Sequence, residues 1–190
     1  MDLNGTYSYA DYLTWRFEQT LEIIKGKILP MAALSRRHQK ISSFLHGNLY
    51  IFFEKHLCDV YAAPFDVRLF DKNKSIKANK DIFTVIQPDI CVVCDESKLD
   101  DAGCLGSPDV IIEILLLGNS KKEMKIKKDL YEENGVREYW IFDPEHESAL
   151  KFVLSENNLY ETTKIYSNED ILDSSIFEGL QINLEKLFVY

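Results

Sequence analysis

The sequence predicts an α/β domain built on a central mixed β-sheet with helices on its faces. Apolar, β-branched runs typical of buried strands alternate along the chain with amphipathic patterns at helical spacing, a mixture that favours a layered fold. The 190 residues are 46% apolar, and a chain of this size buries roughly 70% of the surface it exposes when unfolded. We therefore expect residues 1–190 to form a single domain.

Three elements are predicted in the first third of the chain. Ser8 and Asp11 have the spacing of a capping box, and Tyr9, Tyr12, Leu13 and Phe17 repeat with helical spacing, so a short amphipathic helix is expected to follow. Apolar segments on both sides of Lys25-Gly26 indicate a small hairpin. Ser35 begins a longer helical pattern. The apolar stripe of that helix consists of Ile41, Phe44, Leu45, Leu49, Phe52 and Phe53.

Strand-like segments dominate the middle of the chain. Cys58–Phe70 and Val85–Cys94 are rich in β-branched and aromatic residues, and the polar stretch Asp71–Lys80 between them is predicted to be a mobile loop. Pro108–Leu117 is a third strand-like run. It is apolar at both odd and even positions, so we expect its strand to be covered on both faces of the sheet.

The last third of the chain continues the alternation. A helix is expected from about Ser120 to Glu133, and Asn134-Gly135 suits its C-terminal cap. Glu138–Phe142 is predicted to be another buried strand, ending at Asp143-Pro144. The remaining residues suggest a peripheral C-terminal hairpin and a short final helix.

Charge restricts the class of function. The formal net charge is −9, which argues against a protein that coats nucleic acid through bulk electrostatics, so any such contact must be local. Two basic clusters stand out, and each is either a solvated helix face or a local binding surface. They comprise Arg36, Arg37 and Lys40 in one, and Lys121, Lys122, Lys125, Lys127 and Lys128 in the other.

Targeting signals are not evident in the sequence. No apolar run approaches the roughly 20 residues that span a bilayer, and the segment Met1–Tyr12 lacks the pattern of a secretory signal. We expect a cytoplasmic protein without a membrane partner. In that compartment the four cysteines (Cys58, Cys91, Cys94 and Cys104) should be reduced thiols.

The spacing of Cys91 and Cys94 does not indicate a metal site. Both lie in a predicted strand, where positions three apart point to opposite faces of the sheet. Two thiols on opposite faces cannot share a metal, and the sequence holds no second pair with zinc spacing. We therefore interpret both as core residues.

The most informative residue is an acid inside an apolar strand. Glu113 interrupts the run Val110–Leu117, and a buried carboxylate is costly unless it is paired or binds a metal. Asp89 begins another apolar strand and would bring a second oxygen ligand if the two strands are neighbours. Asp109 is a weaker candidate, because four strand residues separate it from Glu113 by about 13 Å.

Phosphodiester hydrolysis would also need a lysine to orient water and offset negative charge. The position two after Glu113 is Leu115, so the following helix must supply it. Lys127 shares a stripe with Met124, Leu130 and Tyr131 and should point towards the sheet. The alternative for Lys127 is an ordinary pair with Glu123 at i,i+4, worth about 0.3–0.5 kcal/mol.

Several segments together resemble the Uma family of restriction endonucleases, within the PD-(D/E)XK nuclease superfamily. Each is weak alone, but their order and spacing are specific, and they extend over nearly the whole chain. They are Tyr9–Leu13, Leu21–Lys27, Arg37–Ile41, Gln87-Pro88-Asp89, Val110–Leu115, Asn119–Met124, Lys127–Tyr131 and Gly135–Pro144.

The resemblance implies a restriction-endonuclease-like core and indicates which residues would form its active site. Asp89 and Glu113 would be metal ligands, and Lys127 would be the catalytic lysine, displaced onto the helix. Glu22 would be an auxiliary acid near the metal. The backbone carbonyl of Ile114 is expected to complete the ligands of Mg²⁺, with Mn²⁺ as a substitute.

Other family positions have different implications. His38 matches a recurrent histidine whose role the sequence does not assign, and Tyr131 is interpreted as a packing residue together with Tyr139 and Trp140. The chain departs from the family after the strand glutamate, where Leu115-Leu116-Leu117 replaces the usual Leu-Ser-Pro. This departure alters the turn from strand to helix.

Three hypotheses follow. The first is a Mg²⁺-dependent endodeoxyribonuclease that hydrolyses phosphodiester bonds of DNA, with Lys127 positioning the attacking water. The second is a catalytically degenerate nuclease fold that acts as a nucleic-acid or protein binding or regulatory module, motivated by the charge of −9 and by Leu116-Leu117. The third makes Glu113 a structural residue paired with Lys127. A homodimer would help such a domain embrace a duplex, but the sequence fixes neither oligomeric state nor sequence preference.

Overall fold

Two six-stranded sheets form the frame of the protein. The computed structural model describes residues 5–16, 21–30, 34–70, 78–116 and 121–189. The main sheet has the order β12-β11-β10-β9-β6-β3, and the N-terminal sheet has the order β2-β1-β5-β4-β8-β7. The main sheet comprises β3 (Asp59–Ala62), β6 (Ile90–Val93), β9 (Val110–Ile114), β10 (Glu138–Asp143), β11 (Ser148–Leu154) and β12 (Tyr160–Ser167). The N-terminal sheet comprises β1 (Leu21–Ile24), β2 (Lys27–Pro30), β4 (Val67–Leu69), β5 (Thr84–Ile86), β7 (Leu99–Asp100) and β8 (Gly103–Leu105).

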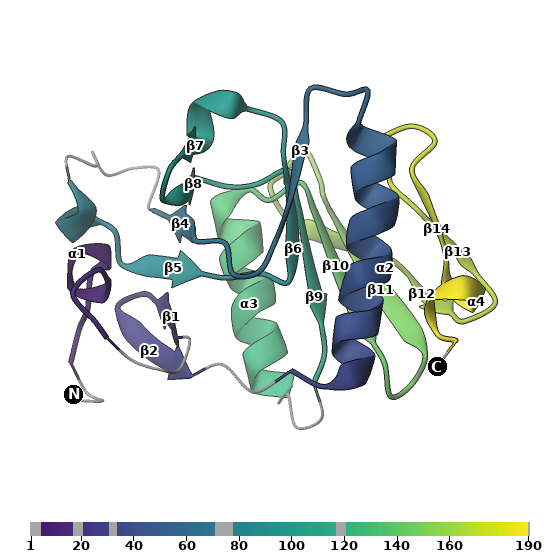
Figure 1. The fold of residues 1–190 in the computed structure, drawn as a ribbon, viewed down its shortest axis with the longest axis horizontal. Helices are drawn as coiled ribbons and strands as arrows, with labels where there is room; N and C mark the ends of the chain where they lie inside the picture. Colours follow the sequence, from purple (N-terminus) through teal and green to yellow (C-terminus); the bar gives the residue numbers. More distant parts are fainter. Residues whose placement is uncertain (1–4, 17–20, 31–33, 71–77, 117–120, 190) are drawn as a thin grey trace.

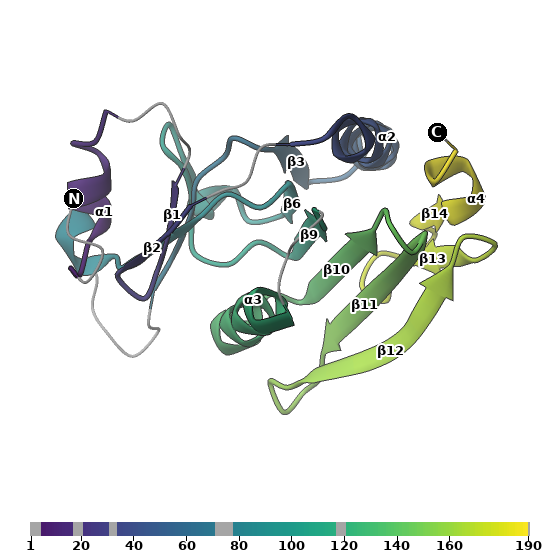
Figure 2. The same ribbon diagram turned by 90° about the horizontal axis from the view of Figure 1, so that it is seen from below.

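The main sheet is the mixed sheet that the sequence predicts. Strands β9 and β10 are parallel, and the other pairs of this sheet are antiparallel. A parallel pair needs a crossover connection, which the helix α3 (Lys121–Asn134) supplies. The longer helix α2 (Arg36–Phe53) covers the opposite face of the sheet from α3 (Figures 1 and 2). The predicted α/β layering is confirmed.

The capping of both helices also agrees with the sequence. The Ser35 side chain accepts a hydrogen bond from the His38 backbone N–H and so satisfies one free donor at the start of α2. Gly135 follows α3 with a φ of 78°, a conformation that glycine adopts without steric cost.

Strand β9 is buried from both sides, as its continuous apolar run predicts. Val110 and Ile112 pack in a core with α2, whereas Ile111 packs in a second core with residues of α3. All five residues of the strand are buried, including Glu113. The carboxylate of Glu113 therefore lies in a strand that has no solvent-exposed face.

The N-terminal region differs in part from the prediction. The capping box of Ser8 and Asp11 is present, but α1 (Tyr9–Tyr12) has only four residues. The hairpin of β1 and β2 turns at Lys25 and Gly26, both with positive φ, as the favoured two-residue turns require. The polar segment 71–77, Phe17 and Leu117 lie outside the described residues. The short strands β7 and β8 are not evident in the sequence.

The expectation of four reduced thiols is wrong for one pair. Cys58 and Cys94 form a disulfide, and Cys91 and Cys104 are free and buried. Cys91 packs on the α3 side of the sheet while Cys94 packs on the α2 side, so the predicted opposite orientation holds. The partner of Cys94 comes from the segment after α2. Thirty-six positions separate the two residues, and no local pattern indicates the pairing.

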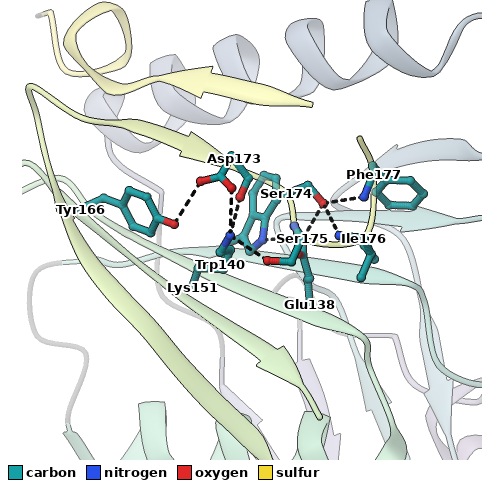
Figure 3. Close-up of polar contacts among 9 residues, drawn as sticks. All are labelled: Glu138, Trp140, Lys151, Tyr166, Asp173, Ser174, Ser175, Ile176 and Phe177. Carbon is teal, nitrogen blue, oxygen red and sulfur yellow. Dashed lines mark hydrogen bonds and ion pairs between the residues drawn. The ribbon is translucent and has the colours of Figure 1, made fainter. Parts of the chain in front are cut away.

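The C-terminal part is fixed to the main sheet by a polar network around the buried side chains of Glu138 and Lys151 (Figure 3). Glu138 accepts hydrogen bonds from the Trp140 indole, the Ser174 hydroxyl and the Ser175 backbone N–H. Lys151 donates to the Asp173 carbonyl and the Ser175 hydroxyl. The predicted hairpin, β11 and β12, forms the edge of the main sheet. It is followed by the hairpin β13 (Ile171–Asp173) and β14 (Gln181–Asn183) and by the short helix α4 (Leu184–Leu187).

Candidate active site

The two acids of the predicted pair lie at adjoining ends of neighbouring strands, Asp89 immediately before β6 and Glu113 near the end of β9. Strands β6 and β9 are antiparallel, with Ile90 opposite Ile112, so one further step of the register brings Asp89 opposite Glu113. The Oδ2 atom of Asp89 accepts a hydrogen bond of 2.7 Å from the backbone N–H of Ile114. The condition set by the sequence, that these strands are neighbours, is therefore met.

Lys127 reaches this pair from α3. Its Nζ lies 2.9 Å from Oε1 of Glu113 and 3.2 Å from Oε1 of Glu22. The Lys127 side chain is 13% exposed, so the ammonium is held inside the protein rather than in solvent. The inward orientation inferred from helical periodicity is correct, and both ion pairs are with acids distant in sequence.

Glu22 comes from the other sheet. It lies on β1 and is 2% exposed, and its Oε1 accepts the backbone N–H of Gln87 at 3.0 Å. Residues Gln87-Pro88-Asp89 connect β5 of the N-terminal sheet to β6 of the main sheet. The site is therefore built where the two sheets meet, and each sheet contributes a carboxylate.

His38 gives the site a contact that the sequence did not assign. Its Nε2 lies 3.1 Å from Oδ1 of Asp89, and the ring is 2% exposed. Its Nδ1 is buried and has no hydrogen-bond partner among the described residues. The first turn of α2 and the N–H of Ile114 thus hold the two oxygens of Asp89 separately. This arrangement fixes the orientation of the carboxylate.

Tyr131 is a site residue that sequence analysis missed. Its hydroxyl donates a 2.6 Å hydrogen bond to Oε1 of Glu113, although the residue was interpreted as packing. The available signal was its position four residues after Lys127, on the same inward stripe of the helix. A buried tyrosine hydroxyl also needs a partner, which in an apolar surrounding points to a nearby acid.

Electrostatics at the site reflect crowding of negative charge. Burial raises the pKa of Glu113 to about 7, with further contributions from Asp89 and Glu22, while Lys127 acts in the opposite direction. Burial lowers the pKa of Lys127, but the carboxylates of Glu113 and Glu22 outweigh it and raise the pKa overall. Lys127 is therefore an ammonium ion among three buried acids.

The residues present suit a hard divalent cation. Carboxylate and carbonyl oxygens are the ligands that Mg²⁺ and Mn²⁺ prefer, and Mg²⁺ often uses only one or two carboxylates, with water and phosphate completing its shell. Asp89 and Glu113 provide two. Across the described parts of the chain, no group of three or more histidine, cysteine or acidic side chains is arranged to hold a metal. The two carboxylates are oxygen donors of the kind that Mg²⁺ and Mn²⁺ prefer, whereas structural zinc sites favour nitrogen and sulfur ligands.

Asp109, the rejected alternative, lies at the other end of β9. Its Oδ2 accepts the backbone N–H of Cys94 at 2.9 Å, and its Oδ1 is 3.0 Å from Arg137. Both partners belong to the end of the strand where the chain enters it. Asp109 is thus a structural residue, in agreement with the distance argument.

Comparison with known proteins places this geometry in a family. Residues 9–185 match the model of the Uma2 family, described as "Putative restriction endonuclease". The chain belongs to the Uma2 family. This membership confirms the resemblance drawn from the sequence motifs, and it relates the protein to restriction endonucleases as a class.

A solved structure has a similar fold. A crystal structure of "a putative nuclease belonging to DUF820" from Anabaena variabilis ATCC 29413 is similar with a TM-score of 0.73 and 17% sequence identity. The similarity covers 96% of this chain and 97% of that one. A search among curated proteins gives no match. None of the described helices is both long enough and apolar enough to cross a membrane.

Proposed function

We propose that this Uma2 protein is a metal-dependent endonuclease that hydrolyses phosphodiester bonds of DNA. One observation carries the proposal. Asp89 immediately before β6, Glu113 of β9 and Lys127 of α3 converge in a buried site where, among the described residues, the acids outnumber the one ammonium. A cluster of this kind is costly for a purely structural purpose and is typical of hydrolytic metal sites.

In this proposal Asp89, Glu113 and the carbonyl of Ile114 would hold Mg²⁺ or Mn²⁺. When bound, the ion would supply Lewis-acid polarisation of the phosphate and activation of the attacking water. Burial keeps bulk water away from the carboxylates, and the low local polarity strengthens their attraction for a cation.

The protein's own groups supply positioning and charge. The Lys127 ammonium orients the attacking water and stabilises the additional negative charge on the phosphate as the bond to the leaving oxygen breaks. Glu22 holds Lys127 in place through the 3.2 Å ion pair. His38 and the N–H of Ile114 keep Asp89 in one orientation, as outer partners of metal ligands commonly do.

The test is cleavage of plasmid and linear duplex DNA by the purified protein with Mg²⁺ or Mn²⁺. We expect cleavage that EDTA abolishes and that Asp89→Asn, Glu113→Gln and Lys127→Met each reduce by at least about 100-fold. Asp109→Asn is the matched control, because it changes an acid next to the same strand as Glu113, away from the site.

The alternatives give different results. Residual activity equal to that of the unchanged protein in Asp89→Asn would reject the proposal. A binding or regulatory module predicts no cleavage and no rise of melting temperature with Mn²⁺. A structural pair of Glu113 and Lys127 predicts loss of stability in the variants with no response to either metal.

A further inference from the structure

The two basic clusters noted in the sequence occupy equivalent places in the fold. One begins α2 and the other begins α3. The first turns of these helices contain Arg36 and Arg37 in one case and Lys121 and Lys122 in the other, with Lys40 and Lys125 one turn further. Clusters separated by more than eighty positions in the sequence thus share a structural context.

Both helices begin at the same end of the molecule. Figure 1 shows α2 and α3 starting at the lower end of the main sheet, where β9 finishes, and Figure 2 shows them on opposite faces of the sheet when viewed from that end. The basic first turns therefore flank the end of the sheet at which β9 reaches Glu113 and Ile114.

The clusters are close to the candidate active site along each helix. Arg36 lies two positions before His38, which contacts Asp89. Lys121 lies six positions before Lys127, which contacts Glu113, and six residues of helix rise about 9 Å. Each cluster is thus within about two helical turns of a residue that touches one of the paired acids.

The position of these cations is unfavourable for the helices themselves. The N-terminus of a helix carries partial positive charge, so a cation in the first turn destabilises it and an anion stabilises it. Helix α2 has no acid in its first turn, and α3 has only Glu123 beside Lys121 and Lys122. Cations placed against the helix dipole favour an anionic ligand, which both the side chains and the backbone N–H groups attract.

Four of these side chains are available to such a ligand. Arg36, Lys121, Lys122 and Lys125 are exposed, and none of them forms an ion pair with another described residue. Lys40 donates to the backbone carbonyl of Val189 and is left out of the argument. The protein as a whole is acidic, so these four unpaired cations make the electrostatic potential locally positive beside the buried acids.

We propose that Arg36, Lys121, Lys122 and Lys125 form a basic rim that binds the sugar–phosphate backbone of nucleic acid. The rim has one part on each side of the sheet. A nucleic-acid strand that lies across the end of the sheet would therefore be bound on both sides of the phosphate that faces Asp89 and Glu113. This inference rests on the proposed nuclease function for its choice of ligand. Its ligand is recognised by repeated phosphate charge and not by base sequence.

The test measures binding without cleavage. A fluorescent DNA duplex and a single strand of the same sequence are titrated with the protein in EDTA over a range of salt concentrations. The rim variant carries Arg36→Gln, Lys121→Gln and Lys122→Gln. The control variant carries Lys55→Gln, Lys80→Gln and Arg137→Gln, which remove the same charge from exposed positions outside the rim, after α2, before β5 and before β10 respectively.

We expect the rim variant to bind at least about tenfold more weakly at physiological salt and to lose about 2.7 from the salt slope on duplex DNA, at about 0.9 per phosphate contact. The control variant should bind like the unchanged protein. The melting temperature of the rim variant should not fall, because its substitutions relieve the helix dipoles. The form of DNA whose binding weakens identifies the backbone that the rim accepts.

Three results would overturn the inference: no binding by the unchanged protein, an equal loss in the control variant, or displacement of DNA by polyglutamate at equal charge. The last result would make the rim a site for acidic proteins. Because the assay contains no metal, its outcome is separate from that of the cleavage test. A protein that binds through the rim but does not cleave would disprove the nuclease function alone.

Discussion

At the scale of single residues, the candidate site brings buried acids together with the ammonium of Lys127. Lys127 forms ion pairs with Glu22 and Glu113, and burial, together with the nearby carboxylates of Asp89 and Glu22, raises the pKa of Glu113 to about 7 although Lys127 lowers it. Tyr131 and Lys127 both bind Oε1 of this residue, whereas its Oε2 accepts no hydrogen bond from any described residue. Oε2 is therefore the oxygen best placed to meet a further cation.

Lys127→Met should lower the stability of the protein without metal but much less in the presence of Mn²⁺. Without metal, removal of the ammonium leaves Glu22 and Glu113 as uncompensated buried acids, so the free energy of unfolding should fall by about 3 kcal/mol. With Mn²⁺ most of this loss should be recovered, because the ion binds only the folded protein and meets no competing cation. Denaturant titrations with EDTA measure the loss of stability, and titrations with Mn²⁺ measure its recovery. Lys128→Met, next along the helix, is the control and should show no such recovery.

The raised pKa of Glu113 predicts how stability depends on pH in EDTA. The folded protein holds this proton up to about pH 7, whereas the carboxyl of an unfolded chain loses it near 4.5. The contribution of protonated Glu113 to the free energy of unfolding is fully present below pH 4.5. It is lost as pH rises towards 7, because the folded state then binds more protons than the unfolded state. Glu113→Gln should remove this decline. The idea fails if the two proteins lose stability in parallel across that window.

Sequence reasoning at this scale worked where a residue type conflicted with its surroundings. Glu113 in an apolar strand and Lys127 on an apolar helix stripe both indicated a buried charge, and each needed a partner. Tyr131 gave no conflict, because an aromatic ring on an inward stripe satisfies packing by itself. His38 marked a helix start, and only the fold shows that Asp89 lies opposite it.

At the scale of elements, α2 is tied to β6 at both of its ends. His38 in its first turn contacts Asp89 immediately before the strand, and Cys58 after the helix is bonded to Cys94 immediately after the strand. The helix therefore holds in place the strand that begins at the site.

Reduction of the Cys58–Cys94 disulfide should destabilise the protein. The bond joins residues 36 positions apart, and closing a loop of that length removes about 4 kcal/mol of unfolded-chain entropy at 25 °C. We expect dithiothreitol to lower the free energy of unfolding by roughly 2–4 kcal/mol. The double variant Cys58→Ser and Cys94→Ser should start at the lower value and show no response to reductant. A response that persists there would assign the effect to another thiol.

Most elements were predictable because their signals are local. The cap at Ser35, the stripe of α2, the turn at Lys25-Gly26 and the stop at Gly135 each depend on neighbours within a few residues. The placement of β5 and β6 in different sheets was not predicted, because Gln87-Pro88-Asp89 interrupts the apolar pattern but does not indicate which sheet each side joins. The disulfide was missed for a related reason, since it depends on a distant contact.

At the scale of the whole molecule, the site depends on the meeting of two sheets. The hydrogen bond from Gln87 to Glu22 and the ion pair from Lys127 to Glu22 join residues 65 and 105 positions apart. Pairings of this kind follow from topology, which residue patterns alone do not specify, and the family resemblance was needed to include Glu22. The main sheet also separates two cores, one beside α2 and one beside α3.

This separation predicts that the C-terminal part can open without disturbing the site. Glu138 lies on the α2 side of the sheet, where it accepts one hydrogen bond from the Trp140 indole and two that hold residues 174 and 175 (Figure 3). Glu138→Ala removes these acceptors and leaves the buried Trp140 indole N–H unpaired, at about 1–3 kcal/mol, together with the partly buried donors of Ser174 and Ser175. Hydrogen exchange should therefore accelerate in residues 171–189, while α3 and its contacts with Glu113 keep their protection.

The control for this experiment is Glu138→Gln, whose side-chain oxygen can still accept from Ser175. The glutamine substitution removes the charge but keeps an acceptor, so exchange rates in that variant should lie between those of the unchanged protein and the alanine variant. Equal acceleration in α3 and in residues 171–189 of the alanine variant would contradict the prediction. It would show that the two sides of the main sheet open together, because β10 carries both Glu138 and the ring of Tyr139 that packs on Tyr131.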